Sequence, residues 1–146
     1  MIEVSSGLEK SGNSIVEIRA INLWQYQETY GISQAIEVSN TQRILFCTGQ
    51  TSVNHEGNPI HKDNMASQIE QALTNLETVL SEADMSFANV VRLICFTTDV
   101  AAYSAASDVL IRRLKTSGCQ PASTLIEVAG LFHPEVMIEL EATAVA

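Results

Sequence analysis

The last predicted strand of the chain carries two carboxylates that could do chemistry. Glu139 and Glu141 lie two residues apart in segment 136–144, so in a strand both side chains project from the same face. A carboxylate held in a site can act as a general base, whereas one on an open outer face is only solvated. Spacing alone leaves both interpretations open.

The histidines show no spacing typical of a metal site. His55, His61 and His133 lie in turn-like segments, and none stands four residues from another ligand. The chain also has no glycine-rich phosphate loop of the right spacing and no nucleophile elbow. Neither metal, nucleotide nor serine-hydrolase chemistry is therefore favoured.

The three cysteines are odd in number and widely spaced, which argues against a disulfide framework. Cys47 and Cys95 fall in apolar runs and are expected to be buried thiols. Cys119 follows Gly118 in a predicted loop and is expected to be exposed.

Composition predicts one soluble globular domain spanning 1–146, with 1–14 as a loose N-terminal segment rich in Ser, Gly and Asn. The net charge of −9, from 17 acidic and 8 basic residues, argues against nucleic acid and anionic membranes as partners. No apolar run approaches the ~20 residues that cross a bilayer. The start of the chain lacks a basic leader and an apolar core, so a cytoplasmic location is expected.

The first half of the chain predicts short strands and a loop. Segment 15–20 is expected to be an edge strand, and 22–32 a loop with aromatic anchors. Segments 35–39 and 43–48 are separated by three polar residues, which favours a hairpin that Gly49 ends.

The second half predicts two helices and three strands. A long helix begins near Asp63, a plausible N-cap, and has an apolar stripe at three- and four-residue spacing. Its stripe comprises Met65, Ile69, Ala72, Leu73, Leu76, Val79, Leu80 and Ala83, and its polar face Gln68, Glu70, Gln71 and Glu77. A second helix is expected over 102–115. The strands are expected at 90–98, central and covered on both faces, at 124–129 and at 136–144.

This element order predicts an α+β fold, a mixed sheet with both helices packed on one face. The face of the last strand that bears Ile138 would lie under the helices. The other sheet face would carry Leu45 and Cys47, or Ile44 and Phe46, and stay partly apolar. A partly apolar open face favours self-association.

Several short motifs, in this order and spacing, resemble the Rid family (YjgF, reactive intermediate deaminase). They run from about residue 33 to residue 145. The motifs are Thr48-Gly49-Gln50, Gln68 with Asn75-Leu76, Phe96-Thr97-Thr98-Asp99, Pro121-Ala122-Ser123-Thr124 with Glu127-Val128, and Ile138-Glu139-Leu140-Glu141-Ala142-Thr143-Ala144.

The resemblance implies a chorismate-mutase-like fold and a homotrimer whose sheets form a central barrel, with small-molecule clefts between subunits. Family members of the deaminase type hydrolyse enamines and imines such as 2-aminoacrylate and its imine, and release ammonia. A cleft arginine grips the substrate carboxylate, and a glutamate on the last strand positions the water or moves its proton. No metal or organic cofactor is used.

Transferred to this chain, the family's catalytic glutamate falls on Glu139 and its cleft arginine on Ser123. The family's tyrosine falls on Ile32 and its asparagine on Ser107, so three polar cleft contacts are changed. The resemblance also assigns Thr48 and Gly49 to the substrate-binding cleft.

A serine hydroxyl cannot replace the two parallel charge-assisted hydrogen bonds that a guanidinium makes to a carboxylate. Losing one partner of a buried charge pair typically costs ~2–5 kcal/mol, so small α-imino acids are expected to bind poorly. Arg92 and Arg43 are candidates to supply a charge. Trp24 and Tyr26 are expected to serve packing rather than to line the cleft.

Three functional hypotheses follow. The first is a trimer that hydrolyses an enamine or imine other than 2-aminoacrylate, with Glu139 as general base. The second is a non-catalytic metabolite-binding or interaction trimer in which Glu139 recognises an amine or hydroxyl. The third, ribonuclease or translation-inhibitor activity, is the least favoured because the chain is acidic.

Overall fold

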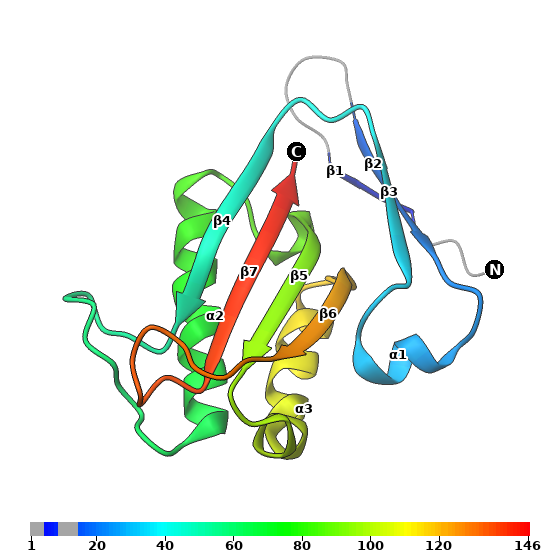
Figure 1. Ribbon diagram of the computed structural model, residues 1–146. Helices are drawn as coiled ribbons and strands as arrows, with labels where there is room; N and C mark the ends of the chain where they lie inside the picture. Colours follow the sequence, from blue (N-terminus) through cyan, green and yellow to red (C-terminus); the bar gives the residue numbers. More distant parts are fainter. Residues whose placement is uncertain (1–4, 9–14) are drawn as a thin grey trace.

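The computed structural model describes the backbone of residues 5–8 and all of residues 15–146. A mixed four-stranded sheet, two helices behind it and a separate three-stranded sheet make up the fold (Figure 1). Its elements, in chain order, are β1 Ser5–Leu8, β2 Val16–Ile21, α1 Tyr26–Tyr30, β3 Ala35–Ser39, β4 Ile44–Thr51, α2 Met65–Glu82, the 3₁₀ helix η1 Phe87–Asn89, β5 Val90–Thr97, α3 Val100–Thr116, β6 Ala122–Glu127 and β7 Ile138–Val145.

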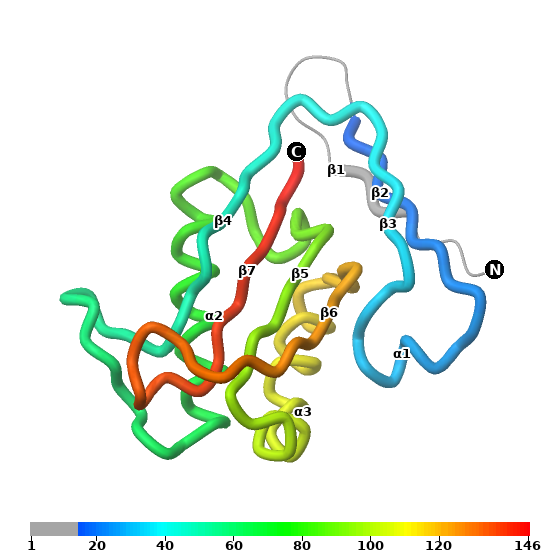
Figure 2. Tube along the Cα trace, in the orientation of Figure 1, coloured from blue at the N-terminus to red at the C-terminus, as the bar shows by residue number. Residues whose placement is uncertain are grey.

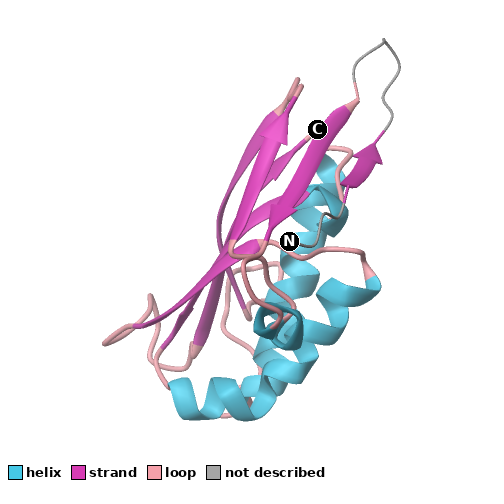
Figure 3. Cartoon of the chain, turned by 90° about the vertical axis from the view of Figure 1, so that its right-hand side faces the viewer, coloured by secondary structure: helices cyan, strands magenta, loops and turns pink. Residues whose placement is uncertain are grey.

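The main sheet has the strand order β4-β7-β5-β6, in which β5 and β6 are parallel and the other neighbours antiparallel. Seen from the side, α2 and α3 lie on one side of these strands (Figure 3). The expectation of an α+β fold with a mixed sheet and both long helices on one face is confirmed. The short helix α1 and the second sheet were not anticipated.

The core lies between the main sheet and α2 and α3. From α2, the stripe residues Ile69, Leu73, Leu76 and Leu80 are fully buried, and Ile138 of β7 faces them. The apolar spacing of this helix was therefore a reliable signal. Its N-cap is one residue later than expected, because the side chain of Asn64 accepts a hydrogen bond from the Ser67 N–H at 2.9 Å.

The faces of β7 agree with the alternation in its sequence. The residues directed toward the helices are buried, namely Val136, Ile138, Leu140, Ala142 and Ala144. On β4, Leu45 and Cys47 pack into the same core, while Ile44 and Phe46 are 58% and 78% exposed. Of the two alternatives for the open face, the pair Ile44 and Phe46 is correct.

The predicted hairpin is wrong. The chain crosses from β3 in the small sheet to β4 at the far edge of the main sheet (Figure 2). There β4 pairs with β7, with Ile44 opposite Val145, and β3 pairs with β2, with Val38 opposite Ile18. Strand β4 thus pairs with the last strand rather than with the neighbouring β3, and the turn residues between β3 and β4 do not reveal this.

The small sheet has the order β1-β2-β3, so β2 is its central strand and not an edge. Val16 and Ile18 of β2 pack against Val91 and Val145 of the main sheet. The predicted loose segment 1–14 contains β1 at its centre, and the rest of that segment lies outside the described residues.

Three further expectations about burial are wrong. Cys119 is buried rather than exposed, because the chain after α3 turns back under Val90, whose carbonyl oxygen is 3.7 Å from the thiol sulfur. Trp24 and Tyr26 are more than half exposed and do not anchor the loop by burial. Strand β5 is covered by helices on one face only, since Arg92 is exposed on the other. Cys47 and Cys95 are buried, as expected.

Candidate functional site

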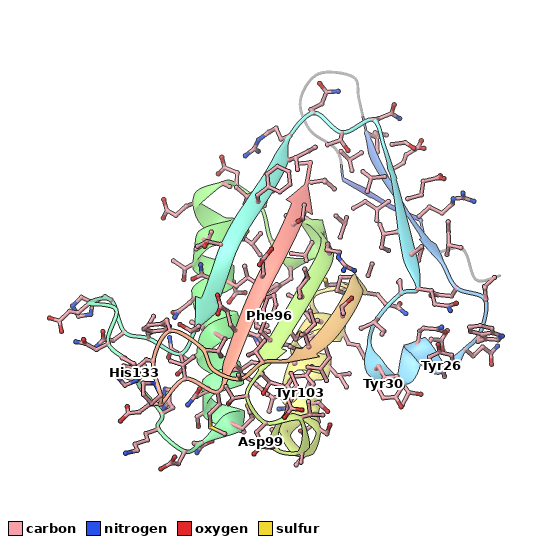
Figure 4. All side chains as sticks on the ribbon, in the orientation of Figure 1. Tyr26, Tyr30, Phe96, Asp99, Tyr103 and His133 are labelled. Carbon is pink, nitrogen blue, oxygen red and sulfur yellow. The ribbon has the colours of Figure 1, made fainter. Side chains whose placement is uncertain are left out.

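Glu139 lies near the start of β7, on the face of the main sheet that the helices leave open. Its neighbours in register are Thr51 on β4 and Phe96 on β5. Ile138 and Leu140, on either side in sequence, are fully buried under the helices, so the alternation directs Glu139 the other way. Figure 4 shows Phe96 in front of the main sheet.

The Glu139 carboxylate is electrostatically perturbed. Partial burial, and secondarily the nearby charge of Glu141, raise the pKa of Glu139 above the ordinary glutamate value. Among the described residues, its carboxylate has no hydrogen-bond or ion-pair partner. A carboxylate in this state is a competent proton acceptor near neutral pH.

Gly49 makes room for this carboxylate. The register between β4 and β7 shifts between Cys47 and Gln50, which marks a β-bulge at Thr48 and Gly49. A Cβ atom on Gly49 would lie 1.8 Å from Oε1 of Glu139 and 2.5 Å from its Cδ. Only glycine leaves the carboxylate its observed position, so the structure brings Thr48, Gly49 and Glu139 together.

Ser123 lies on the other face of the sheet. It is in register with the buried Leu93, and its hydroxyl hydrogen-bonds the thiol of Cys95, as does Tyr103 of α3. Burial raises the pKa of Cys95 to about 11, so this thiol stays protonated. Within one chain the sheet separates Ser123 from Glu139.

Ser107 and Ile32 also lie away from Glu139. Ser107 is on α3, one turn beyond Tyr103 and hence on the same side of that helix as the Ser123 contact, and its hydroxyl donates to the Ser104 carbonyl at 3.0 Å. Ile32 follows α1, and its carbonyl accepts a hydrogen bond from the Gln120 amide at 3.0 Å. Thr48, Gly49 and Glu139 thus form one group on the open face. Ser123, Ser107 and Ile32 form a second group away from it, with Ser123 and Ser107 on the helix side and Ile32 beside the outer edge of β6.

Neither candidate arginine reaches the Glu139 carboxylate. Arg92 is on the open face, but it donates to the Thr124 hydroxyl at 3.1 Å and lies four strand positions from Phe96, roughly 13 Å along the sheet. Arg43 donates to the Ala83 carbonyl at the end of α2. No guanidinium of the described residues therefore stands beside Glu139.

The aromatic residues near α1 are remote from this site. The rings of Trp24 and Tyr26 stack with centroids 6.0 Å apart. Figure 4 shows Tyr26 and Tyr30 around α1, to the right of the main sheet that carries Phe96. They do not line the surroundings of Glu139 within one chain.

Gln68 was assigned to the polar face of its helix, and that prediction is wrong. It is 1% exposed, and its amide nitrogen donates to the carbonyls of His61 and Glu135 at 3.2 and 2.8 Å. Its amide oxygen accepts from the Met137 N–H at 2.9 Å. Gln68 therefore fixes the chain two residues before Glu139.

Asn75 holds the other strand of the site. Its amide nitrogen donates to the carbonyls of Thr51 and Val53 at 2.9 and 3.1 Å, directly after the bulge at Gly49. The sequence did offer a signal for the contacts of Gln68 and Asn75. These two amide side chains lie seven residues apart on one helix, at the border of its apolar stripe.

Within the described part of the chain, no group of three or more His, Cys, Asp or Glu side chains could hold a metal ion. None of the helices described there is long and apolar enough to span a membrane.

The family model described as Endoribonuclease L-PSP matches residues 27–146. The chain belongs to that family. It is also called the YjgF, RutC or Rid family, so the resemblance in the motifs is confirmed. The Rid-family match includes both groups of site residues.

Individual Rid-family proteins are similar to the chain over most of its length. It is 30% identical over 112 residues to a RutC family protein of Pyrococcus abyssi, covering 77% of this chain and 84% of that protein. It is 31% identical over 113 residues to the 2-iminobutanoate/2-iminopropanoate deaminase of Capra hircus, covering 77% and 78%. The structure of the Rid protein YyfB from Yersinia pestis superposes with a TM-score of 0.77 at 32% identity, covering 88% and 98%.

Proposed function

We propose that the chain forms a homotrimer with a small-molecule cleft between subunits, in which Glu139 acts as general base in the hydrolysis of an enamine or imine other than 2-aminoacrylate. The observation that carries the proposal is the Glu139 carboxylate itself. It is partly shielded on the open sheet face, has a raised pKa and occupies space that Gly49 leaves free.

The open face supports self-association. Phe46 is 78% and Ile44 58% exposed there, on the same side as Glu139. Apolar side chains of this size on a sheet face favour burial against a partner. A second copy bound to this face would shield Glu139 further from solvent. It would also allow Ser123 and Ser107 of one copy to approach Glu139 of another.

The reaction fits a single carboxylate base. Glu139 accepts a proton from water as the water oxygen bonds to the imine carbon, and returns it to the nitrogen to give a carbinolamine. Glu139 then moves the hydroxyl proton of the carbinolamine to the nitrogen as the C–N bond breaks and the C=O bond forms. The products are a carbonyl compound and ammonia, so no electrons leave or enter. Among the described residues no guanidinium stands near Glu139, which argues for a substrate without a carboxylate at the position that an arginine would grip.

A second candidate is a trimer that binds an amine-bearing metabolite without turnover. In support, the Ser123 hydroxyl already makes a hydrogen bond to the Cys95 thiol, so Glu139 would be the main polar group of the cleft that is free to bind a ligand. An ammonium group would pair with its carboxylate.

The proposal can be tested with imines that a second enzyme generates in the assay mixture. An amino-acid oxidase supplies imines that carry a carboxylate, an amine oxidase supplies imines that lack one, and imine decay and ammonia are followed. We expect acceleration for carboxylate-free imines only, lost in Glu139→Gln and kept in Glu141→Gln. Faster decay of the carboxylate-bearing imines would refute the proposed substrate class, and binding without acceleration would favour the second candidate.

A further inference from the structure

A cavity of about 390 Å³ lies between the small sheet and the carboxyl end of α3. Its walls come from β2, α1, β3, the 3₁₀ helix, the start of β5 and the segment that follows α3. None of the six residues assigned to the Glu139 cleft lines it. Its volume falls in the range of about 300–1,000 Å³ that is usual for small-molecule sites.

The interior of this cavity is apolar. Ile18 and Ala20 of β2, Ile36 of β3 and Val90 of β5 contribute to its wall, and three of these side chains are less than 10% exposed. A wall of branched aliphatic side chains favours an aliphatic group of similar size.

Two opposite charges stand at the cavity. Glu28 of α1 and Lys115 of α3 both line it, and both are exposed. Neither makes an ion pair or a hydrogen bond through its charged group with any other described residue. They do not pair with each other within 4.0 Å, so each charge is available to a ligand.

The packing of α1 against α3 places Glu28 and Lys115 on neighbouring turns of these two helices. Gly31 at the end of α1 meets Ile111 of α3, where an added Cβ would be 3.3 Å from its Cγ2. Glu28 is three residues before Gly31, and Lys115 is four residues after Ile111, so each lies on the contacting side of its helix. The close approach at Gly31 thus sets one anion and one cation beside the same cavity.

The carbonyl groups at the end of α3 are not available to bind the cationic group of a ligand. Its last carbonyls accept hydrogen bonds from the N–H groups of Ser117, Gly118 and Cys119. The Lys115 ammonium makes no ion pair with the described residues, so it can attract a ligand carboxylate at this end.

We propose that this cavity binds a zwitterion with an aliphatic side chain, that is, an apolar α-amino acid. The ligand carboxylate pairs with Lys115, its ammonium with Glu28, and its side chain enters the apolar interior. This site is separate from the Glu139 cleft and does not depend on imine hydrolysis.

Calorimetric titration of the full chain with L-leucine tests the proposal. We expect saturable binding that Lys115→Met and Glu28→Gln each weaken about 2- to 5-fold, as for exposed charge pairs. Ala20→Leu, which fills the interior, should abolish binding. Arg112→Met, an exposed charge on the same helix, and Glu139→Gln should change the affinity less than about twofold.

Analogues separate the ligand classes. Isocaproate lacks the ammonium, isoamylamine lacks the carboxylate, and L-serine lacks the aliphatic side chain, so each should bind more weakly than leucine. Absence of leucine binding up to about 10 mM would overturn the proposal. So would binding that Glu139→Gln abolishes while Lys115→Met preserves it, or equal affinity for leucine and isocaproate. These outcomes leave the test of imine hydrolysis untouched.

Discussion

Replacing Gly49 by alanine tests the geometry of the Glu139 site most sharply. The new Cβ would lie 1.8 Å from Oε1 of Glu139, whereas an ordinary contact is at least 3.4 Å, so the carboxylate must move by about 1.6 Å. The clashing atoms belong to the end of a flexible side chain, and a changed rotamer costs only about 0.5–1.5 kcal/mol. Gly49→Ala should therefore fold, with its melting temperature lowered by roughly 1–6 °C.

Gly49→Ala should reduce the rate of imine hydrolysis much more than it reduces the stability of the fold. A misplacement of about 1 Å typically reduces catalysis on the order of 100-fold, so imine hydrolysis should fall by at least that factor. The moved carboxylate loses its shielding, so the pKa of Glu139 should also fall toward its ordinary value. Carboxyl NMR titration measures this change without any substrate.

Gly130→Ala is the matched control, because no atom lies within 4 Å of the Cβ position at Gly130. This variant should keep the Glu139 pKa and the activity, with a stability that is unchanged or raised by up to about 1 kcal/mol. If Gly49→Ala retains both the wild-type activity and the raised Glu139 pKa, the assignment of Gly49 to positioning the carboxylate is refuted.

Three further predictions concern stability. Because folding raises the pKa of Glu139, its ionised form weakens the fold above that pKa. Glu139→Gln should therefore be more stable than wild type near pH 7 in urea titrations, and the difference should shrink toward about pH 4; an equal difference at both pH values would contradict this. Arg113→Ala removes a guanidinium that pairs at 2.7 Å with two carboxylates of α2, and should lose about 1–2 kcal/mol of unfolding free energy. The exposed neighbour Arg112→Ala should lose less than about 0.5 kcal/mol, and equal losses would argue against a link between the helices. Gln68→Leu removes the hydrogen-bond partner of the Glu135 carbonyl and of the Met137 N–H, whereas the His61 carbonyl keeps the Asn64 N–H. It should lose about 2 kcal/mol or more, against about 0.5 kcal/mol or less for the exposed Ser81→Ala on the same helix. A loss as small as that of Ser81→Ala would show that Gln68 does not hold the entry to β7.

Periodicity predicted those parts of the fold whose burial is decided locally. The stripe of α2 and the alternation of β7 each record which face meets the core, and therefore also placed Glu139 and Glu141 on the opposite face. The family motifs then predicted Glu139, rather than Glu141, as the functional glutamate. The structure adds the reason why Gly49 belongs with it.

Local sequence patterns could not predict contacts between segments that are distant in sequence. Strand β4 pairs with β7, which lies far along the chain, and β3 pairs with the preceding β2, so the turn-like connection between β3 and β4 indicated a hairpin that does not form. Gln68 looked like a surface residue because its three partners come from a loop and from the segment before β7. The sheet also puts Ser123 on the face opposite Glu139, which strand boundaries uncertain by a residue or two could not establish.

The pH dependence of imine hydrolysis is the decisive test of whether Glu139 is the general base. With a carboxylate-free imine from an amine oxidase, kcat/KM should rise with pH through one ionisation above the ordinary glutamate pKa of about 4.3, because the ionised Glu139 is the active form. In Glu139→Gln the rate should fall about 100-fold or more and this ionisation should disappear, while Glu141→Gln should retain it. An unchanged rate and pH profile in Glu139→Gln would contradict the account.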